Sequence, residues 1–78
     1  MTEADDFAVE MHYYQMRIAG RLDDEFVTSF CPAGTEATWD ADGTRLERIE
    51  TDQSGIIGLI RSLHNLGCTI LYLERKEQ

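Results

Sequence analysis

The chain has 78 residues, which is enough for one small domain and leaves no room for a second hydrophobic core. Hydrophobic residues make up 42% of it and charged residues 28%, values typical of a folded protein, so disorder along the whole chain is excluded. The net charge of −8 disfavours direct nucleic-acid binding, because phosphates repel an acidic surface. An acidic surface can also imitate nucleic acid, but acidity in small proteins commonly serves solubility.

The sequence also bears on the compartment. No apolar run reaches the roughly 18 residues that span a membrane, and an acidic N-terminus has the wrong charge for a signal peptide. We therefore expect a cytoplasmic protein without membrane association. Cys31 and Cys68 do not form a C-x-x-C pair, and we interpret them as reduced, mostly buried thiols, with a disulfide as the alternative.

The N-terminal part divides into a tail and a strand. Residues 1–10 are acidic and without periodicity, so we expect a disordered tail before a single α+β domain at residues 11–78. From Met11 the apolar side chains recur at even positions, namely Tyr14, Met16, Ile18 and Leu22, whereas Gln15, Arg17 and Arg21 take odd positions. This alternation predicts a strand with one apolar and one polar face.

A short helix is predicted next. Asp23 is a suitable N-cap, and acidic residues after it favour the positive end of a helix dipole. Phe26, Val27 and Phe30 share one helical face before Pro32 and Gly34 end the segment. Only two turns fit, so a loop here remains the alternative.

Two strands follow, at residues 35–39 and 44–50, joined by the turn Asp40-Ala41-Asp42-Gly43. Leu46 and Ile49 are three residues apart and cannot share one face of a regular strand. A β-bulge, an early strand end or burial on both faces would explain this spacing. A calcium loop is excluded, because Thr38 and Ile49 stand where its first and last carboxylates belong.

The clearest element is a helix capped by Asp52 or Thr51. Its apolar residues have helical spacing, at Ile56, Leu59, Ile60, Leu63 and Leu66. Gly67 stands where a left-handed residue ends a helix. Residues 69–73 are predicted as the last strand, before a charged and frayed tail at 74–78.

This order of elements predicts the fold. A strand, a short helix, two strands, a long helix and a strand are typical of the ferredoxin-like βαββαβ plait, a four-stranded antiparallel sheet with both helices on one face. Right-handed crossovers place the first and third strands in the middle. If the short helix fails to form, an order of three strands, one helix and one strand remains.

No motif for catalysis is present. His12 and His64 do not combine with the cysteines in the spacing of a zinc module, and the glycines near residue 55 lack the lysine of a phosphate loop. We therefore predict that the protein is not an enzyme and has no cofactor and no metal. Gly55 and Gly58 are expected to let the helix pack closely on the sheet, with ligand access to the helix N-terminus as the alternative.

The sheet face without helices is the candidate interaction surface. The third strand adds either Arg45 and Glu47 or Thr44, Arg48 and Glu50 to it, depending on register. The residues expected to carry contacts are Tyr13, Gln15, Arg17, Arg21, Arg45 and Arg48. RNA reading is disfavoured, because the third strand has no aromatic residue. We favour a homodimer or docking on another protein, with a merely solvated face of Arg–Glu pairs as the alternative.

Most of the chain resembles small stand-alone uncharacterised proteins of high-GC bacteria. Their patterns are Y-x-h-R-h-x-G-x-L, D-G-T-x-L and D-Q-x-x-h-x-G-L-h-x-x-h-x-x-L-G, where h is apolar. Here they match Tyr14–Leu22, Asp42–Leu46 and Asp52–Gly67. The resemblance extends from Tyr14 to about Arg75; it implies one domain complete in itself and no particular activity.

A shorter stretch is similar to ACT ligand-binding domains. Their pattern D-x-x-G…L-x-x-x-G-x-x-I matches Asp52, Gly55, Leu63, Gly67 and Ile70. In such domains the loop and helix start bind amino acids between paired subunits. The similarity implies, as the alternative function, a small-molecule sensing site. Its residues would be Asp52, Gln53, Ser54 and Gly55.

Overall fold

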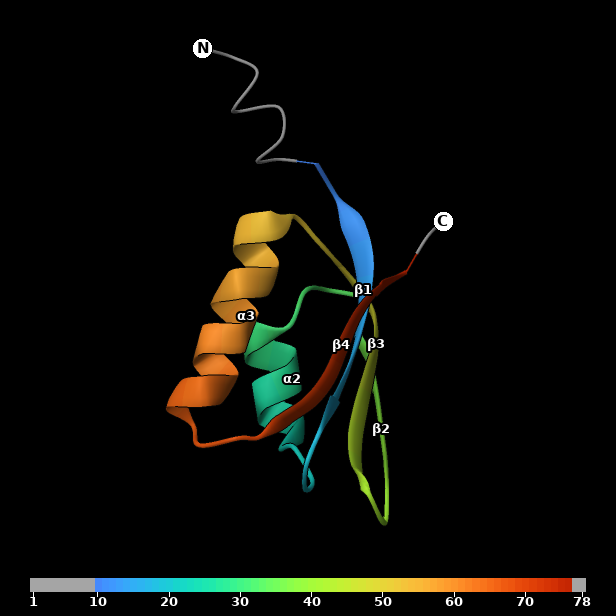
Figure 1. Ribbon diagram of the computed structural model, residues 1–78, viewed down its shortest axis with the longest axis vertical. Helices are drawn as coiled ribbons and strands as arrows, with labels where there is room; N and C mark the ends of the chain where they lie inside the picture. Colours follow the sequence, from blue (N-terminus) through green and yellow to red (C-terminus); the bar gives the residue numbers. More distant parts are fainter. Residues whose placement is uncertain (1–9, 77–78) are drawn as a thin grey trace.

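The computed structural model describes residues 10–76, so the predictions for residues 1–9, 77 and 78 fall outside the described residues. Its elements are β1 (His12–Ile18), α2 (Asp24–Phe30), β2 (Glu36–Asp40), β3 (Gly43–Thr51), α3 (Gln53–Asn65) and β4 (Ile70–Lys76). The strands form one antiparallel sheet in the order β2-β3-β1-β4. Both helices lie on the same face of it (Figure 1). The α+β class and the middle places of the first and third strands are confirmed.

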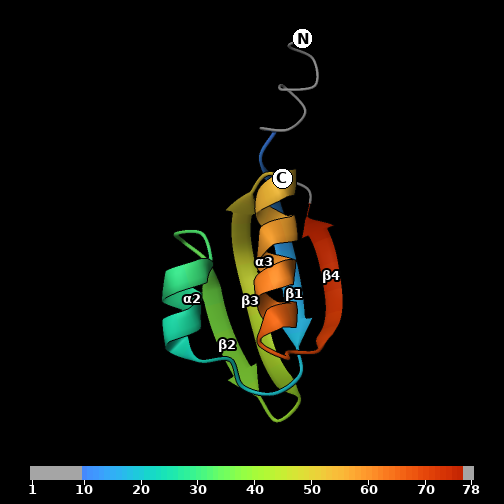
Figure 2. The ribbon, with the colours of Figure 1, turned by 90° about the vertical axis from the view of Figure 1, so that its left-hand side faces the viewer.

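The two helices divide that face between them. Figure 2 shows α3 in front of β3 and β1, whereas α2 lies beside β2 at the edge of the sheet. The space between helices and sheet is filled by a small core: Met16, Ile18, Leu22, Phe26, Leu46, Ile49, Ile56, Leu59 and Leu63. Within residues 10–76, neither helix has the length and apolar character needed to cross a bilayer.

The prediction that the first strand continues to Leu22 is wrong. β1 ends at Ile18, and residues 19–23 form an irregular connection in which Gly20 has a φ of 80°. Leu22 reaches the core through this connection and is held there by Thr44. The buried Thr44 hydroxyl accepts a hydrogen bond from the Leu22 N–H at 2.8 Å and donates one to the Gly20 carbonyl at 2.8 Å.

The short helix α2 forms as predicted, so the loop alternative is wrong. The Asp23 side chain caps it by accepting a hydrogen bond from the Glu25 N–H at 3.2 Å. Phe26 is buried and stacks on Phe30, with ring centroids 4.8 Å apart. Phe30 itself is 58% exposed, because α2 lies at the margin of the sheet and only one of its flanks meets the core.

A β-bulge explains the spacing of Leu46 and Ile49. β1 pairs Met16 with Leu46 and Tyr14 with Ile49, so two residues of β3, Glu47 and Arg48, lie opposite the single residue between them. The bulge restores Ile49 to the helix-covered face, and both Leu46 and Ile49 are fully buried. Of the bulge explanation and its two alternatives, the first is therefore confirmed.

Helix α3 begins and ends as its sequence predicts. The Asp52 carboxylate accepts a hydrogen bond from the Gly55 N–H at 2.8 Å, which identifies Asp52 and not Thr51 as the cap. At the other end Gly67 has a φ of 83°, and the N–H groups of Gly67 and Cys68 donate to the carbonyls of His64 and Leu63. This pair of bonds is a Schellman motif.

The two glycines of α3 differ from expectation. A Cβ on Gly58 would meet nothing within 4 Å, so the prediction that Gly58 allows close packing on the sheet is wrong. A Cβ on Gly55 would collide with the Thr51 side chain next to the cap. Gly55 therefore makes room for the helix start rather than for the sheet.

The prediction of a frayed tail from residue 74 is wrong as far as Lys76. β4 continues through Glu74, Arg75 and Lys76, because residues 13–15 of β1 supply pairing partners along this whole length. Charged side chains are tolerated here since β4 is an edge strand, and there they discourage pairing with other chains.

Candidate functional site: the open face of the sheet

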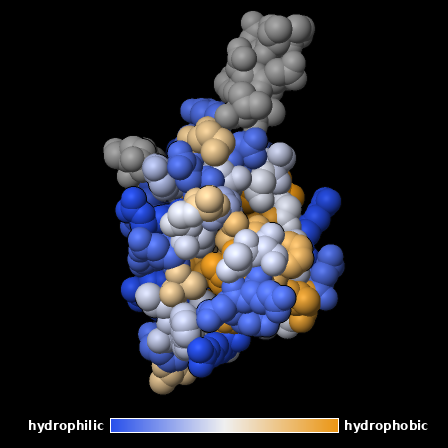
Figure 3. Space-filling model, turned by 180° about the vertical axis from the view of Figure 1, so that it is seen from behind, coloured by the Kyte–Doolittle hydropathy of each residue, from blue (hydrophilic) through white to orange (hydrophobic). Residues whose placement is uncertain are grey.

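The face of the sheet that no helix covers presents polar side chains from all four strands. Register and alternation place there the following residues, which we call the open face: Tyr13, Gln15, Arg17, Glu36, Thr38, Asp40, Arg45, Glu47, Arg48, Glu50, Tyr72, Glu74 and Lys76. In Figure 3 this side of the molecule, at the left, is mostly hydrophilic, whereas hydrophobic colour gathers toward the helices. The open face is thus a polar surface supported by a rigid sheet.

Two neighbouring rows of the open face carry opposite charges. Glu36, Glu47, Gln15 and Glu74 follow one another across the four strands, and we call them the acidic row. The next row along the strands, the basic row, consists of Thr38, Arg45, Arg17 and Tyr72. Acidic and basic groups are therefore separated into bands that run across the strands.

Three ion pairs connect charges on this face. Arg45 Nη1 lies 3.7 Å from Glu47 Oε2, and Arg48 Nε lies 3.8 Å from Glu36 Oε2. The side chains of both pairs are between 41% and 65% exposed. Exposed pairs of this kind contribute only about 0–1 kcal/mol each, so their charges stay available to a partner.

The third ion pair is supported by the hairpin turn. Arg17 Nη2 lies 3.5 Å from Asp40 Oδ1, and the same oxygen accepts hydrogen bonds from the N–H groups of Asp42 at 2.9 Å and Gly43 at 3.2 Å. The hydrogen bond from Asp42, followed by that from Gly43, lowers the pKa of Asp40. A Cβ on Gly43 would collide with the Ile18 carbonyl, so only glycine fits here. The predicted turn is confirmed.

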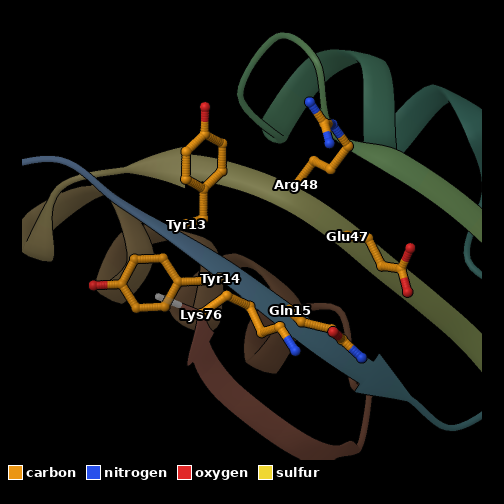
Figure 4. Close-up of a pocket in the computed structure, with 6 residues that line it drawn as sticks. All are labelled: Tyr13, Tyr14, Gln15, Glu47, Arg48 and Lys76. Carbon is orange, nitrogen blue, oxygen red and sulfur yellow. The ribbon is translucent and has the colours of Figure 1, made fainter. Parts of the chain in front are cut away.

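The bulge hollows the open face. A depression of about 290 Å³ lies over it, lined by residues of β1, β3 and β4 (Figure 4). The lining residues are Tyr13, Tyr14, Gln15, Glu47, Arg48 and Lys76. Glu47 and Arg48, the two residues of the bulge, both border this hollow.

The backbone of Arg48 is in a strained conformation. Its φ of 60° makes it the one non-glycine residue with a positive φ within residues 10–76. A left-handed conformation costs a non-glycine residue about 1–2 kcal/mol, a cost that glycine avoids. An arginine is therefore kept where glycine would fit with less strain.

The structure brings five of the six predicted contact residues together and separates the sixth. Arg21 lies beyond β1, and its guanidinium carbon is 4.4 Å from the centroid of the Trp39 ring. Trp39 pairs with the buried Thr44 and so belongs to the helix-covered face. The strand assignment that put Arg21 on the open face is wrong, because β1 ends three residues earlier.

Six open-face residues were missed by the sequence reasoning: Glu36, Thr38 and Asp40 of β2, which was not considered for this face, and, in β4, Tyr72, Glu74 and Lys76. The predicted last strand stopped at Leu73, so most of its polar face lay outside it. The alternation of the three β4 residues with Leu73 and Arg75 is the signal that would have extended the strand. Of the two sets considered for β3, both contribute, since the bulge adds Arg48 and Glu50 to Arg45 and Glu47, and only Thr44 is buried.

The residues named for a ligand site lie together at the start of α3. Asp52 Oδ1 accepts hydrogen bonds from the Gly55 N–H at 2.8 Å and the Ser54 hydroxyl at 3.5 Å, so its carboxylate serves the cap. Gln53 borders a second hollow of about 350 Å³ with His12, Tyr14 and Arg75, close to Glu10.

The cysteines and histidines form no evident centre. Both thiols are free and half-buried, and burial raises the pKa of Cys31 to about 11. Such a thiol is almost entirely protonated at neutral pH and a poor nucleophile. Across residues 10–76, no three side chains of His, Cys, Asp or Glu are placed to hold a metal ion.

A four-stranded antiparallel sheet with two helices on one face and a charged, uncovered face on the other defines a small α+β domain. Residues 13–74 match the family described as Domain of unknown function (DUF8691), and the chain belongs to this family. No curated protein and no solved structure matches the chain. The family description agrees with the expected resemblance to uncharacterised proteins and says nothing of ACT domains or of a source.

Proposed function

We propose that this protein is a non-enzymatic interaction module that docks on another protein chain through its open face. The observation that most supports this proposal is the distribution of charge. Four of the seven cationic residues lie on the open face, within a chain of net charge −8. With these four cations beside five acidic residues, the open face is nearly neutral, so a protein surface can approach it with little charge repulsion.

Two further features support the same surface. Tyr13 and Tyr72 add aromatic side chains, a residue type enriched in protein interfaces. The strained Arg48 borders the hollow, and strain of this kind is commonly retained where side-chain placement serves a function. Rigid strands position both tyrosines and the arginine, so docking requires little ordering of the backbone.

The proposal is tested by reversing one charge on each face of the sheet. Arg17→Glu is expected to weaken binding of captured partners or of a second copy by about tenfold, because it places a carboxylate among the acidic groups of the open face. Arg21→Glu changes the same charge on the helix-covered side and should bind like the wild type. Binding is measured by affinity capture and sedimentation of the purified proteins, with melting curves as the folding control. Equal binding by both variants would refute docking through the open face.

We also assign the domain to the ferredoxin-like plait. This assignment is supported by the strand order β2-β3-β1-β4, in which the two middle strands are each followed by a helix. An experimental structure that places the helices on opposite faces would contradict it.

An ACT-like sensing function is the second candidate. It is supported by one observation, the hollow that Gln53 shares with His12 and Arg75 beside the start of α3. A thermal shift with an amino acid that disappears in Gln53→Ala would favour this function. No shift across the common amino acids would remove it, because the other residues named for the site already serve the helix cap.

A further inference from the structure

We infer that the partner of the open face is a second copy of this chain, stacked face to face about a twofold axis that runs across the strands between the acidic and basic rows. This inference rests on the proposed docking function and names its partner. A closed twofold pair is the commonest form of self-association, and it requires one surface that complements itself. The two rows supply such a surface.

The charges match under this symmetry. A half-turn about the axis keeps each strand over its own copy and exchanges the acidic row with the basic row. Glu47 then faces Arg45 of the second copy, and the reverse contact forms at the same time. Glu74 faces the Tyr72 hydroxyl of the second copy, a pairing that already occurs within one chain.

The remaining members of the two rows add no conflict. Gln15 faces Arg17 of the second copy, and Glu36 faces Thr38. No two like charges of these rows meet. A twofold axis parallel to the strands, between β3 and β1, would instead place each row over itself and bring Glu36 over Glu74.

The shape of the open face fits the same arrangement. The hollow at the bulge is bordered by Gln15 and Glu47, which are members of the acidic row, and so it lies opposite the basic row of the second copy. Stacked sheets are about 10 Å apart, a gap that an extended arginine and a glutamate span together. Arg45 of the second copy can therefore reach Glu47 at the border of the hollow.

Charge repulsion between two copies is small across the open face. The open face holds four of the seven cationic residues and five of the fifteen acidic ones, so it is close to neutral. Nearly all of the net charge of −8 therefore lies elsewhere on the chain. Two copies that met at the acidic start of α2, where Asp23, Asp24 and Glu25 follow one another, would instead bring negative charges together.

A charge exchange between two neighbouring residues of β3 tests the inference. Arg45→Glu alone and Glu47→Arg alone should each weaken dimerisation about tenfold, because each change affects two symmetry-related contacts. The double variant R45E/E47R recreates both contacts with reversed polarity and should return to within about threefold of the wild type. Arg61→Glu, an exposed change on α3, should have no effect. The dimerisation constants are measured by sedimentation equilibrium, with a melting curve for each variant.

Two results would overturn the inference: a wild-type protein that stays monomeric at the highest soluble concentration, or a double variant as weak as the single ones. If the Arg45 variants fail to fold, Glu74→Lys provides the same test, since it removes the contact with Tyr72 at an exposed site. A monomer that still captures another protein in an Arg17-dependent manner would overturn the second copy as partner and leave the proposed function standing.

Discussion

Arg48 is the residue whose backbone and surroundings disagree most. Its φ of 60° is set by the bulge, and the bulge is set by Leu46 and Ile49, which must both reach the core. The side chain is largely exposed and makes only a long ion pair with Glu36. Within residues 10–76, the packing does not require an arginine at this position.

Comparison of glycine and alanine at position 48 measures this strain. Arg48→Gly should exceed Arg48→Ala in free energy of unfolding by about 1 kcal/mol, because glycine adopts a positive φ at little steric cost. Urea denaturation of the two variants is the measurement, and both lack the arginine side chain, so lost contacts cancel. Alanine equal to or better than glycine would show that the backbone at position 48 is not strained.

At the scale of one element, the two glycines of α3 have different roles. A side chain at Gly58 would contact nothing, whereas a side chain at Gly55 would collide with a neighbour. The Thr51 side chain, next to the Asp52 cap, occupies the space that a side chain at Gly55 would need. Gly58 is exposed and would carry a Cβ without contact. Glycine in a helix interior costs roughly 0.5–1 kcal/mol relative to alanine, so Gly58 lowers stability without a packing benefit.

The two alanine variants should therefore change stability in opposite directions. Gly58→Ala is expected to raise the free energy of unfolding by about 0.5–1 kcal/mol through helix propensity alone. Gly55→Ala is expected to lower it, since the new methyl group displaces the Thr51 side chain and disturbs the cap. Thermal and chemical denaturation of the two variants measure these changes in the free energy of unfolding. A loss of stability in Gly58→Ala would contradict the prediction and point to a contact that glycine makes with a ligand or partner.

Local signals in the sequence predicted most elements. Asp23, Asp52 and Gly67 act through hydrogen bonds to neighbours in sequence, and the Leu46–Ile49 spacing already suggested a bulge. The strand ends were not predictable in this way. Leu22 continues an alternation by coincidence and is buried through a hydrogen bond to a residue far along the chain.

The prediction of the candidate surface was correct where the strand assignments were correct and wrong where they were wrong. The open-face residues of β1 and β3 follow from alternation and the bulge, whereas Arg21 was misplaced with the end of β1. The polar face of β4 was missed because charged residues form a strand only when a neighbouring strand supplies partners. The local sequence pattern does not show that β1 lies beside residues 74–76.

At the scale of the whole molecule, the core is small and each buried side chain matters. A chain of this length is stable by about 4–12 kcal/mol. The sequence pattern of α3 treats Leu63 and Leu66 alike, yet Leu63 is fully buried and Leu66 is 61% exposed. Leu66 lies at the C-cap, where the helix ends.

These two leucines offer a matched test of the core. Leu63→Ala should cost about 3–5 kcal/mol, the range for leucines truncated in a packed core, which is a large part of the total stability. Leu66→Ala should change stability by less than about 1 kcal/mol, as surface substitutions commonly do. Equal losses in urea denaturation would mean that Leu66 is covered in solution, for example by a partner.

The Thr44 hydroxyl has a consequence for how the native pairing is chosen. If β3 slipped by one residue against β1, every side chain of β3 would exchange faces; Arg45 would enter the interior and the hydroxyl would leave it. The amide of Leu22 and the carbonyl of Gly20 would then lose their shared bridge. The Thr44 hydroxyl thus disfavours a misaligned pairing of β1 and β3, in addition to the apolar contacts of the core. It also makes the path of residues 19–23 depend on the correct register.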